Sequence, residues 1–206
     1  MRETIPYQFE RQPLLIVISG PAGVGKDALL QSMNERGHHF HFVVTATDRA
    51  PRPGEIHGED YFFLTTEEFL RMEREGELLE HAIVYGQHKG VPKRHVRQAM
   101  DSGQDVVMRV DVQGAATIRS MAPEAMLIFL TARSEGELEQ RLRDRGKDSP
   151  AQIQERIATS HKEMEQLSKF DYVVVNRDGE LERAVDDVIA IIQAEHCRVE
   201  QREVKL

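Results

Sequence analysis

The residues best suited to chemistry form a glycine-rich stretch that follows a run of apolar residues. Residues 14–19 are apolar or small, and Gly20-Pro-Ala-Gly-Val-Gly-Lys26 comes directly after them. Such a run is typical of a strand buried on both faces. A loop that leaves this strand and opens a helix presents unpaired backbone N–H groups to one concavity, which attracts phosphate. Because Lys26 adds a cation for the β- and γ-phosphates, we favour phosphate binding over an ordinary glycine-rich turn.

This stretch departs from the usual phosphate-loop pattern at one position. Asp27 follows Lys26 where a serine or threonine hydroxyl usually reaches Mg²⁺. A carboxylate at this place can meet the metal directly or through a water molecule. Asp27 is therefore our candidate metal ligand.

A second group suited to anion binding is a loop that contains two arginines. Arg49 and Arg52 lie three positions apart between prolines, in a stretch whose proline and glycine content predicts a loop. Guanidinium groups grip phosphate in a bidentate manner that lysine cannot copy. Tyr61 follows and can lend its hydroxyl to the same anion. Exposed salt bridges are the alternative role of these arginines.

Two further features lie later in the chain. Asp111 is at the carboxyl end of an apolar stretch, where ligands of open α/β sheets collect, although helix capping is an alternative. Arginines are also frequent in two expected helices that flank Gly146. Arg141, Arg143 and Arg145 precede this glycine, and Arg156 follows it. The composition is typical of a mobile lid or, alternatively, of a solvated helical hairpin with charge pairs.

The elements that must position these residues are strands that alternate with helices. We expect strands over residues 14–19, 40–47, 104–112, 126–130 and 172–176, and helices over 28–36, 93–102, 115–121, 134–145, 151–167 and 181–199. This order predicts an α/β fold with a mostly parallel sheet and helices on both faces. Residues 60–90 lack the alternation, which indicates an insertion of short strands that carries the second substrate. Residues 89–92 are expected to break the chain before the next helix.

The bulk composition narrows the class of protein. The 206 residues suit one α/β domain with small insertions, and the formal charge of −8 argues against nucleic-acid and anionic-membrane partners. Cys197 is the only cysteine, so neither an intramolecular disulfide nor a cysteine metal cluster can form. No apolar stretch approaches 18 residues, and residues 1–13 lack the apolar core of a signal peptide. We expect a cytoplasmic protein.

Several motifs together resemble one enzyme family. They are Gly20-Pro-Ala-Gly-Val-Gly-Lys26, Arg49-x-Pro-Arg52-Pro-Gly-Glu55-x-x-Gly58-x-Asp60-Tyr61, Leu79-Glu80, Val110-Asp111-Val-Gln113-Gly114 and Val173-x-Val-Asn176. In this order, over residues 14–194, they resemble guanylate kinase. The resemblance implies a P-loop kinase with a mostly parallel central sheet, a GMP-binding insertion and a helical lid. It also implies phosphorylation of GMP, and of dGMP as a second acceptor, by ATP with Mg²⁺.

The resemblance also assigns roles to residues of this chain. It implies an ATP site at Gly20, Pro21, Ala22, Gly23, Val24, Gly25, Lys26, Asp27, Arg141 and Asn176. It implies a GMP site at Thr45, Arg49, Arg52, Tyr61, Glu80, Lys89 and Asp111. The catalytic cations would be Lys26, Arg49, Arg145 and Arg156. Carboxylates suit guanine because they only accept hydrogen bonds, whereas its N1–H and exocyclic amine donate them.

Some positions differ from the common pattern of the family. Lys89 stands at the place of a phosphate-binding tyrosine, Val91 near that of a serine that reads guanine, and Arg109 at that of an acidic residue. Together with Asp27, these variants resemble the branch typified by plant organellar guanylate kinases.

The expected organisation is a core over residues 14–47 and 103–206, with a lid at about 141–158. Residues 48–92 would form the GMP-binding insertion, and residues 1–13 an N-terminal extension. A monomer or a homodimer is expected. Two alternatives to a GMP kinase stay open. One is a kinase of the same fold that acts on another phosphorylated acceptor, and the other is a non-catalytic binding module.

Overall fold

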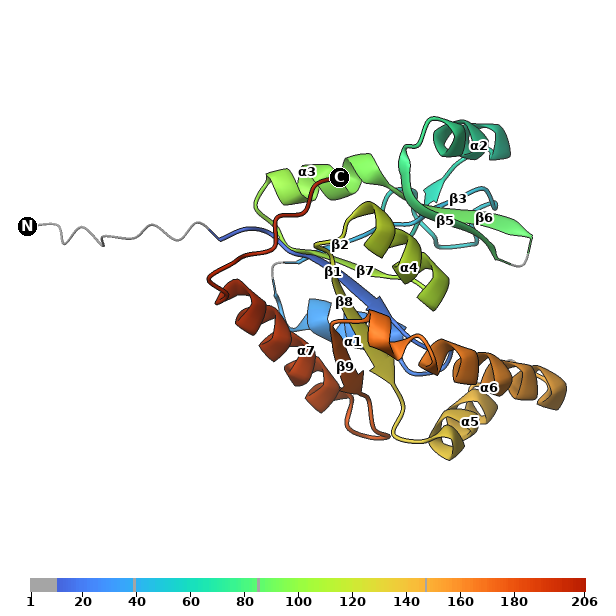
Figure 1. Cartoon of the computed structure of the whole chain (residues 1–206). Coiled ribbons are helices and arrows are strands. Elements are labelled where there is room, and N and C mark those ends of the chain that lie inside the picture. The colour runs from blue at the N-terminus through green and yellow to red at the C-terminus, as the bar shows by residue number, and fades with distance from the viewer. Residues whose placement is uncertain (1–10, 39, 85, 147) are drawn as a thin grey trace, which may run out of the picture.

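A parallel five-stranded sheet forms the centre of the molecule (Figure 1). The structure is a computed structural model that describes residues 11–38, 40–84, 86–146 and 148–206. The strands lie in the order β2 (His41–Phe42), β7 (Val106–Arg109), β1 (Leu15–Ser19), β8 (Met126–Thr131) and β9 (Tyr172–Val175). All four neighbouring pairs are parallel. The predicted α/β fold is therefore confirmed, and β1 lies in the middle of the sheet.

Helices cover both faces of this sheet because the side chains of β1 alternate between two apolar clusters. Ile16 and Ile18 pack with α1 (Lys26–Glu35) and α7 (Leu181–His196). Leu15 and Val17 pack with α3 (Lys93–Asp101) and α4 (Val112–Met121) on the other face. Each of these four side chains is fully buried and contributes about 1.5–3 kcal/mol relative to exposure. The burial on both faces explains the continuous apolar run in the sequence.

A second, four-stranded sheet carries the expected insertion. Its strands lie in the order β4 (Phe62–Phe63), β3 (Ala46–Thr47), β6 (Gln87–Pro92) and β5 (Leu78–Val84). Helix α2 (Thr66–Arg74) adjoins it and begins with the capping box of Thr65 and Glu68. The buried ring of Phe69 in α2 packs against Leu78 and Ala46, so the sheet has a small core of its own.

Two of the expected elements are wrong in this region. Residues 40–47 do not form one strand, because β2 pairs with β7 in the central sheet whereas β3 pairs with β4 and β6 in the second sheet. The chain thus passes from one sheet to the other between residues 42 and 46. Residues 89–92 do not interrupt the chain, because they belong to β6 and pair with β5. Pro92 is the last residue of that strand and the N-cap of α3, positions at which its missing N–H is tolerated.

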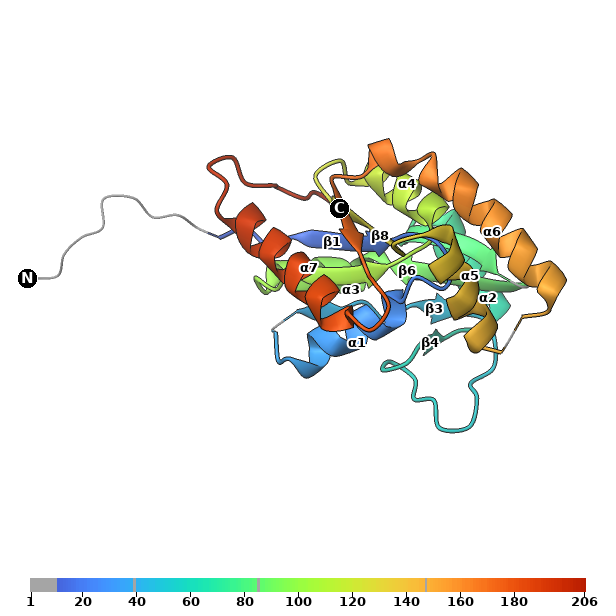
Figure 2. The ribbon, with the colours of Figure 1, turned by 90° about the horizontal axis from the view of Figure 1, so that it is seen from below.

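The arginine-rich region is a pair of packed helices, α5 (Glu135–Asp144) and α6 (Pro150–Met164). Ser134 caps α5, and Ser149 begins α6 with a capping box followed by Pro150. Leucines of α5 and isoleucines of α6 join the apolar cluster of the central sheet, so the pair is not solvated on all sides. Figures 1 and 2 show that this pair and the second sheet project from the same end of the molecule, toward which the central strands point.

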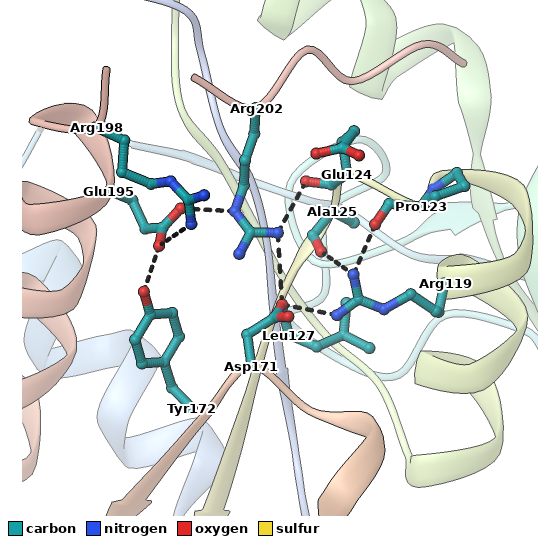
Figure 3. A network of polar contacts seen from close by, with 10 residues as sticks. All are labelled: Arg119, Pro123, Glu124, Ala125, Leu127, Asp171, Tyr172, Glu195, Arg198 and Arg202. Atoms are coloured by element: carbon teal, nitrogen blue, oxygen red, sulfur yellow. Dashed lines mark hydrogen bonds and ion pairs between the residues drawn. The ribbon is translucent and has the colours of Figure 1, made fainter. Parts of the chain in front are cut away.

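A network of charged groups fastens the C-terminal segment to the core (Figure 3). Glu195 of α7 is buried, and its carboxylate accepts hydrogen bonds from the Tyr172 hydroxyl and, at 2.6 Å, from Arg202 Nε. Burial raises the pKa of Glu195, but the hydrogen bonds from Tyr172 and Arg202 outweigh it and leave the pKa lowered. Asp171 lies 2.7 Å from Arg119 and 3.6 Å from Arg202.

No helix within the described ranges is long and apolar enough to cross a bilayer.

Removal of Arg202 should destabilise the fold. Arg202→Met leaves Glu195 buried with fewer donors, so we expect a loss of about 2 kcal/mol in the free energy of unfolding, measured by urea titration at pH 7. Because the folded pKa of Glu195 is lowered, the stabilisation is present above the ordinary glutamate pKa and is lost as the pH falls through the folded value. Arg183→Met, which removes an exposed partner of Glu180, is the control and should cost under about 0.5 kcal/mol. Equal losses in the two variants would contradict this account.

Candidate active site

A cavity of about 630 Å³ lies between the phosphate loop, the carboxyl end of β7 and the second sheet. Of the residues predicted to bind nucleotides, it is lined by Ala22, Gly23, Gly25, Lys26, Asp27, Thr45, Tyr61, Glu80, Lys89, Asp111 and Arg145. The predicted residues outside this lining are Gly20, Pro21, Val24, Arg49, Arg52, Arg141, Arg156 and Asn176. The cavity thus brings together residues from both sheets and from the lid.

Backbone geometry sets the phosphate loop at the end of β1. Gly25 is the N-cap of α1 and has φ of +95°, a left-handed conformation that favours glycine. Gly20 has φ of +135°, and a Cβ there would lie 2.0 Å from the Leu130 carbonyl oxygen of β8. Only glycine permits this approach of loop and strand. The first N–H groups of α1 have no partners within the helix and lie at the cavity.

Lys26 is folded back on the loop and is partly buried. Its Nζ donates to the carbonyl oxygens of Gly20 and, at 3.0 Å, of Pro21. Burial lowers the pKa of Lys26 to about 8, although the carboxylates of Glu163 and Asp111 act in the opposite direction. Anionic phosphate beside this amine would favour its charged form.

Asn176 and Arg141 support the phosphate loop from behind. The buried Asn176 donates through Nδ2 to the Val24 carbonyl oxygen at 2.8 Å, and Arg141 donates to the same oxygen at 3.3 Å. Arg141 also donates to the Asn176 carbonyl at 2.9 Å and pairs with Glu137. The Oδ1 atom of Asn176 is buried without a hydrogen-bond partner among the described residues. Such an acceptor suits the exocyclic amine of adenine.

Two carboxylates approach each other on the opposite wall. Burial, and secondarily the nearby Asp111, raises the pKa of Glu80 to about 7. Asp111 is the N-cap of α4, and its Oδ1 accepts from the Gly114 N–H at 2.7 Å. A Cβ on Gly114 would lie 3.1 Å from Glu80 Cγ, so this glycine lets α4 approach β5. Helix capping and cavity lining, considered as alternatives from the sequence, are thus combined in Asp111.

The two arginines of the loop after β3 differ in position. Arg49 forms two 2.6 Å hydrogen bonds with Glu55, and its guanidinium carbon lies 4.7 Å from the centroid of the Tyr61 ring. Arg52 is exposed, and its backbone N–H donates to the same carboxylate at 2.7 Å. The hydrogen bond from Arg49 is the main reason why the pKa of Glu55 falls to about 2. Glu55 therefore shapes this loop, a role that its place in the sequence motif did not reveal.

The lid supplies cations from two helices. Arg145, at the C-cap of α5, lines the main cavity. Arg156 of α6 pairs with Asp148 at 3.0 Å and lines a smaller neighbouring cavity of about 250 Å³ together with Glu163. Burial raises the pKa of Glu163, although Lys26 acts in the opposite direction. Sequence reasoning missed both acidic residues. The packing of α6 brings Glu163 near Lys26, and Asp148, which precedes α6, pairs with Arg156.

The metal candidate Asp27 is engaged by a residue from another element. Its carboxylate forms an ion pair with Arg109, the last residue of β7, and both residues line the main cavity. The donor set suits Mg²⁺ delivered with a nucleotide, because this ion is commonly bound through one or two carboxylates together with substrate phosphates.

Comparison with known proteins identifies the family. The family model described as "Guanylate kinase" matches residues 12–195. The chain belongs to the guanylate kinase family. It is 51% identical over 196 residues to a protein of Oryza sativa subsp. japonica named "Guanylate kinase 2, chloroplastic/mitochondrial", covering 95% of this chain and 69% of that one. It is 41% identical over 194 residues to a guanylate kinase of Caldanaerobacter subterraneus subsp. tengcongensis, covering 94% and 93%.

A solved structure supports the same assignment. The crystal structure of guanylate kinase from Anaplasma phagocytophilum matches with a TM-score of 0.72 at 29% sequence identity, covering 93% of this chain and 90% of that one. The resemblance to the guanylate kinase family and the predicted fold class are both confirmed. The high identity to a chloroplastic/mitochondrial relative agrees with the variants that resemble the plant organellar branch.

The raised pKa of Glu80 predicts that the ionised Glu80 carboxylate lowers the free energy of unfolding of this protein. A glutamate whose folded pKa lies above its unfolded value destabilises the protein increasingly as the pH rises through the folded pKa. Glu80→Gln should therefore raise the free energy of unfolding by about 2 kcal/mol at pH 8 and by under about 1 kcal/mol at pH 5, measured by urea titration. Glu77→Gln, at an exposed position nearby, should change neither value. A stability gain that does not depend on pH would contradict the assigned cause.

Proposed function

We propose that this chain is an ATP-dependent nucleoside monophosphate kinase that transfers the γ-phosphoryl group of ATP to GMP, and also to dGMP, giving ADP and GDP or dGDP. The observation that carries the proposal is one cavity with a phosphate loop on one wall and two acidic side chains on the other. Membership of the guanylate kinase family supports the same reaction. A sugar phosphate acceptor would not need the neighbouring carboxylates of Glu80 and Asp111 in this cavity.

The donor nucleotide is assigned to the loop and the lid. Backbone N–H groups of the loop and Lys26 would bind the β- and γ-phosphates, and Arg145 and Arg156 would close on them. Asn176 would accept a hydrogen bond from adenine, and Arg141 would hold the loop in place.

The acceptor nucleotide is assigned to the second sheet and the end of β7. Glu80 and Asp111 would accept hydrogen bonds from guanine, with Thr45 beside them. Adenine would leave these carboxylates without donors, which disfavours AMP as the acceptor. Arg49, Arg52, Tyr61 and Lys89 would hold the acceptor phosphate. For this, Arg49 must exchange Glu55 for phosphate, and Arg52 must turn toward the cavity.

Phosphoryl transfer would then follow from position and charge. The acceptor oxygen is already anionic, so no general base is required, and the cations allow two anions to approach in line. Asp27 would hold Mg²⁺ directly or through water, and the chemistry that the ion would supply is neutralisation of phosphate charge. Lid helices that exclude water would prevent the loss of ATP by hydrolysis.

The remaining assignments are predictions from the sequence. We propose a core at residues 14–47 and 103–206, an insertion at 48–92 and a lid at about 141–158. A cytoplasmic location, a monomeric or homodimeric state and the lack of nucleic-acid or membrane partners stay predictions as well. The Oryza sativa relative carries a chloroplastic/mitochondrial name.

Two variants should separate the roles of the two walls. Lys26→Ala should lower kcat for GMP phosphorylation by about 10²–10³-fold, because it removes a positive charge that would stabilise the transferring phosphoryl group. Glu80→Gln should raise the KM for GMP at least about tenfold with a smaller effect on kcat, and should narrow the preference for GMP over AMP. Steady-state assays of ADP formation measure both.

The controls fix the interpretation of these assays. Glu77→Gln should keep the wild-type kcat and KM, because this exposed residue lies outside the cavity lining. A near-normal kcat in Lys26→Ala would contradict the proposed role of Lys26 in phosphoryl transfer. An unchanged KM for GMP in Glu80→Gln would contradict the proposal that Glu80 of the second sheet recognises guanine.

A further inference from the structure

A partly buried pair of an aspartate and a histidine joins two strands of the second sheet beside the arginine loop. Asp48 directly follows β3, and His88 lies in β6, which pairs with β3. The Asp48 carboxylate accepts a hydrogen bond from the His88 backbone N–H at 2.8 Å and lies 2.6 Å from the imidazole Nδ1. Because Thr47 lies opposite Lys89 in the ladder of the two strands, the pair continues this ladder by one position.

Further contacts fix both members of the pair. Thr66, the first residue of α2, donates through its hydroxyl to Asp48 Oδ2 at 3.0 Å. The Thr47 hydroxyl donates to the His88 carbonyl oxygen at 2.9 Å, and the His88 ring lies 5.2 Å from the ring of buried Phe69 between centroids. Burial raises the pKa of Asp48, but the hydrogen bonds from His88 and Thr66 outweigh it and leave the pKa lowered. The carboxylate is therefore ionised at neutral pH.

The residues that directly follow this pair are two of the cations proposed to hold the acceptor phosphate. Arg49 follows Asp48, and Lys89 follows His88. Both cations lie beside the ring of Tyr61, with the Arg49 guanidinium carbon 4.7 Å and Lys89 Nζ 5.7 Å from its centroid. Because side chains alternate along a strand, Lys89 lines the cavity while His88 lies toward α2 on the other face of the sheet.

On the basis of the proposed function, we propose that the Asp48–His88 pair positions the two cations that hold the acceptor phosphate. The pair fastens the start of the arginine loop to β6 and so sets the separation between Arg49 and Lys89. Both side chains are long and flexible, and a fixed backbone lessens the freedom that they lose when they bind phosphate. Asp48 and His88 lie outside the cavity lining, so they are positioning residues.

This role predicts a loss of affinity that is confined to the acceptor phosphate. Guanosine carries the base of GMP without its phosphate, so its binding depends on the acidic wall and not on Arg49 or Lys89. Loss of the pair should therefore weaken the binding of GMP and leave that of guanosine unchanged. A pair that only stabilised the fold would affect both ligands alike, or neither.

The experiment measures the dissociation constants of GMP and of guanosine by NMR titration of the full chain. Asp48→Ala should weaken GMP binding about tenfold, the size expected when a charge-assisted contact to phosphate is lost, and should change guanosine binding by under about twofold. Glu73→Ala is the matched control, because Glu73 of α2 lies 3.7 Å from His81 in a more exposed pair of the same kind. It should leave both constants at the wild-type values.

Two variants of His88 separate its hydrogen bond from its packing. His88→Phe keeps a ring against Phe69 but removes the donor to Asp48. His88→Asn removes the ring but can place an N–H donor where Nδ1 lies. The affinity for GMP should follow the donor, with a loss of about fivefold in His88→Phe and of under about twofold in His88→Asn.

Three outcomes would overturn the proposal. A folded Asp48→Ala variant could bind GMP as tightly as wild type, or lose guanosine as much as GMP, or His88→Asn could lose as much GMP affinity as His88→Phe. Circular dichroism checks that each variant is folded, and the two His88 variants decide the question if Asp48→Ala is not. Wild-type protein that binds GMP no more tightly than guanosine would contradict the proposed function itself. Tight GMP binding by wild type and variants alike would contradict only the positioning role.

Discussion

Positive charge around the cavity is held in place by carboxylates of the protein itself. Four arginines near the proposed phosphate positions are paired in this way: Arg49 with Glu55, Arg109 with Asp27, Arg141 with Glu137, and Arg156 with Asp148. Binding of phosphate to Arg49 or Arg156, as proposed, would therefore exchange one anion for another, and its net free energy would be the difference between two attractive interactions. A doubly charged phosphate that accepts bidentate hydrogen bonds can displace the carboxylate from the arginine, whereas a singly charged anion without this geometry cannot.

The backbone provides the fixed frame for this exchange. The loop follows β1, which is buried in the middle of a parallel sheet, and it ends where α1 begins with unpaired N–H groups. The approach of Gly20 to Leu130 and the hydrogen bond of Asn176 to Val24 keep the loop in one shape. The cavity wall formed by Glu80 and Asp111 lowers the stability of the fold, since burial of Glu80 disfavours its charged form and raises its pKa. A ligand with two hydrogen-bond donors would offset that cost.

Much of this arrangement was predictable from local sequence. The apolar run before Gly20 and the glycines after it predicted β1 and the phosphate loop, because both depend on neighbours along the chain. Local sequence predicts one strand over residues 40–47, which is wrong, because the change of sheet between Phe42 and Ala46 depends on which strands pair. Contacts between distant segments were also out of reach. The sequence does not reveal that Arg109 meets Asp27, or that Glu163 of α6 lies near Lys26.

As proposed, one cavity brings two phosphorylated nucleotides together and selects guanine by its acidic wall. The most direct test of this proposal is chromatographic separation of nucleotides after incubation of the full chain with ATP, Mg²⁺ and one acceptor at a time. We expect GMP to yield one GDP and one ADP for each ATP consumed, while AMP and a sugar phosphate yield neither product above background. Consumption of ATP without GDP, or equal phosphorylation of AMP or the sugar phosphate, would contradict the account.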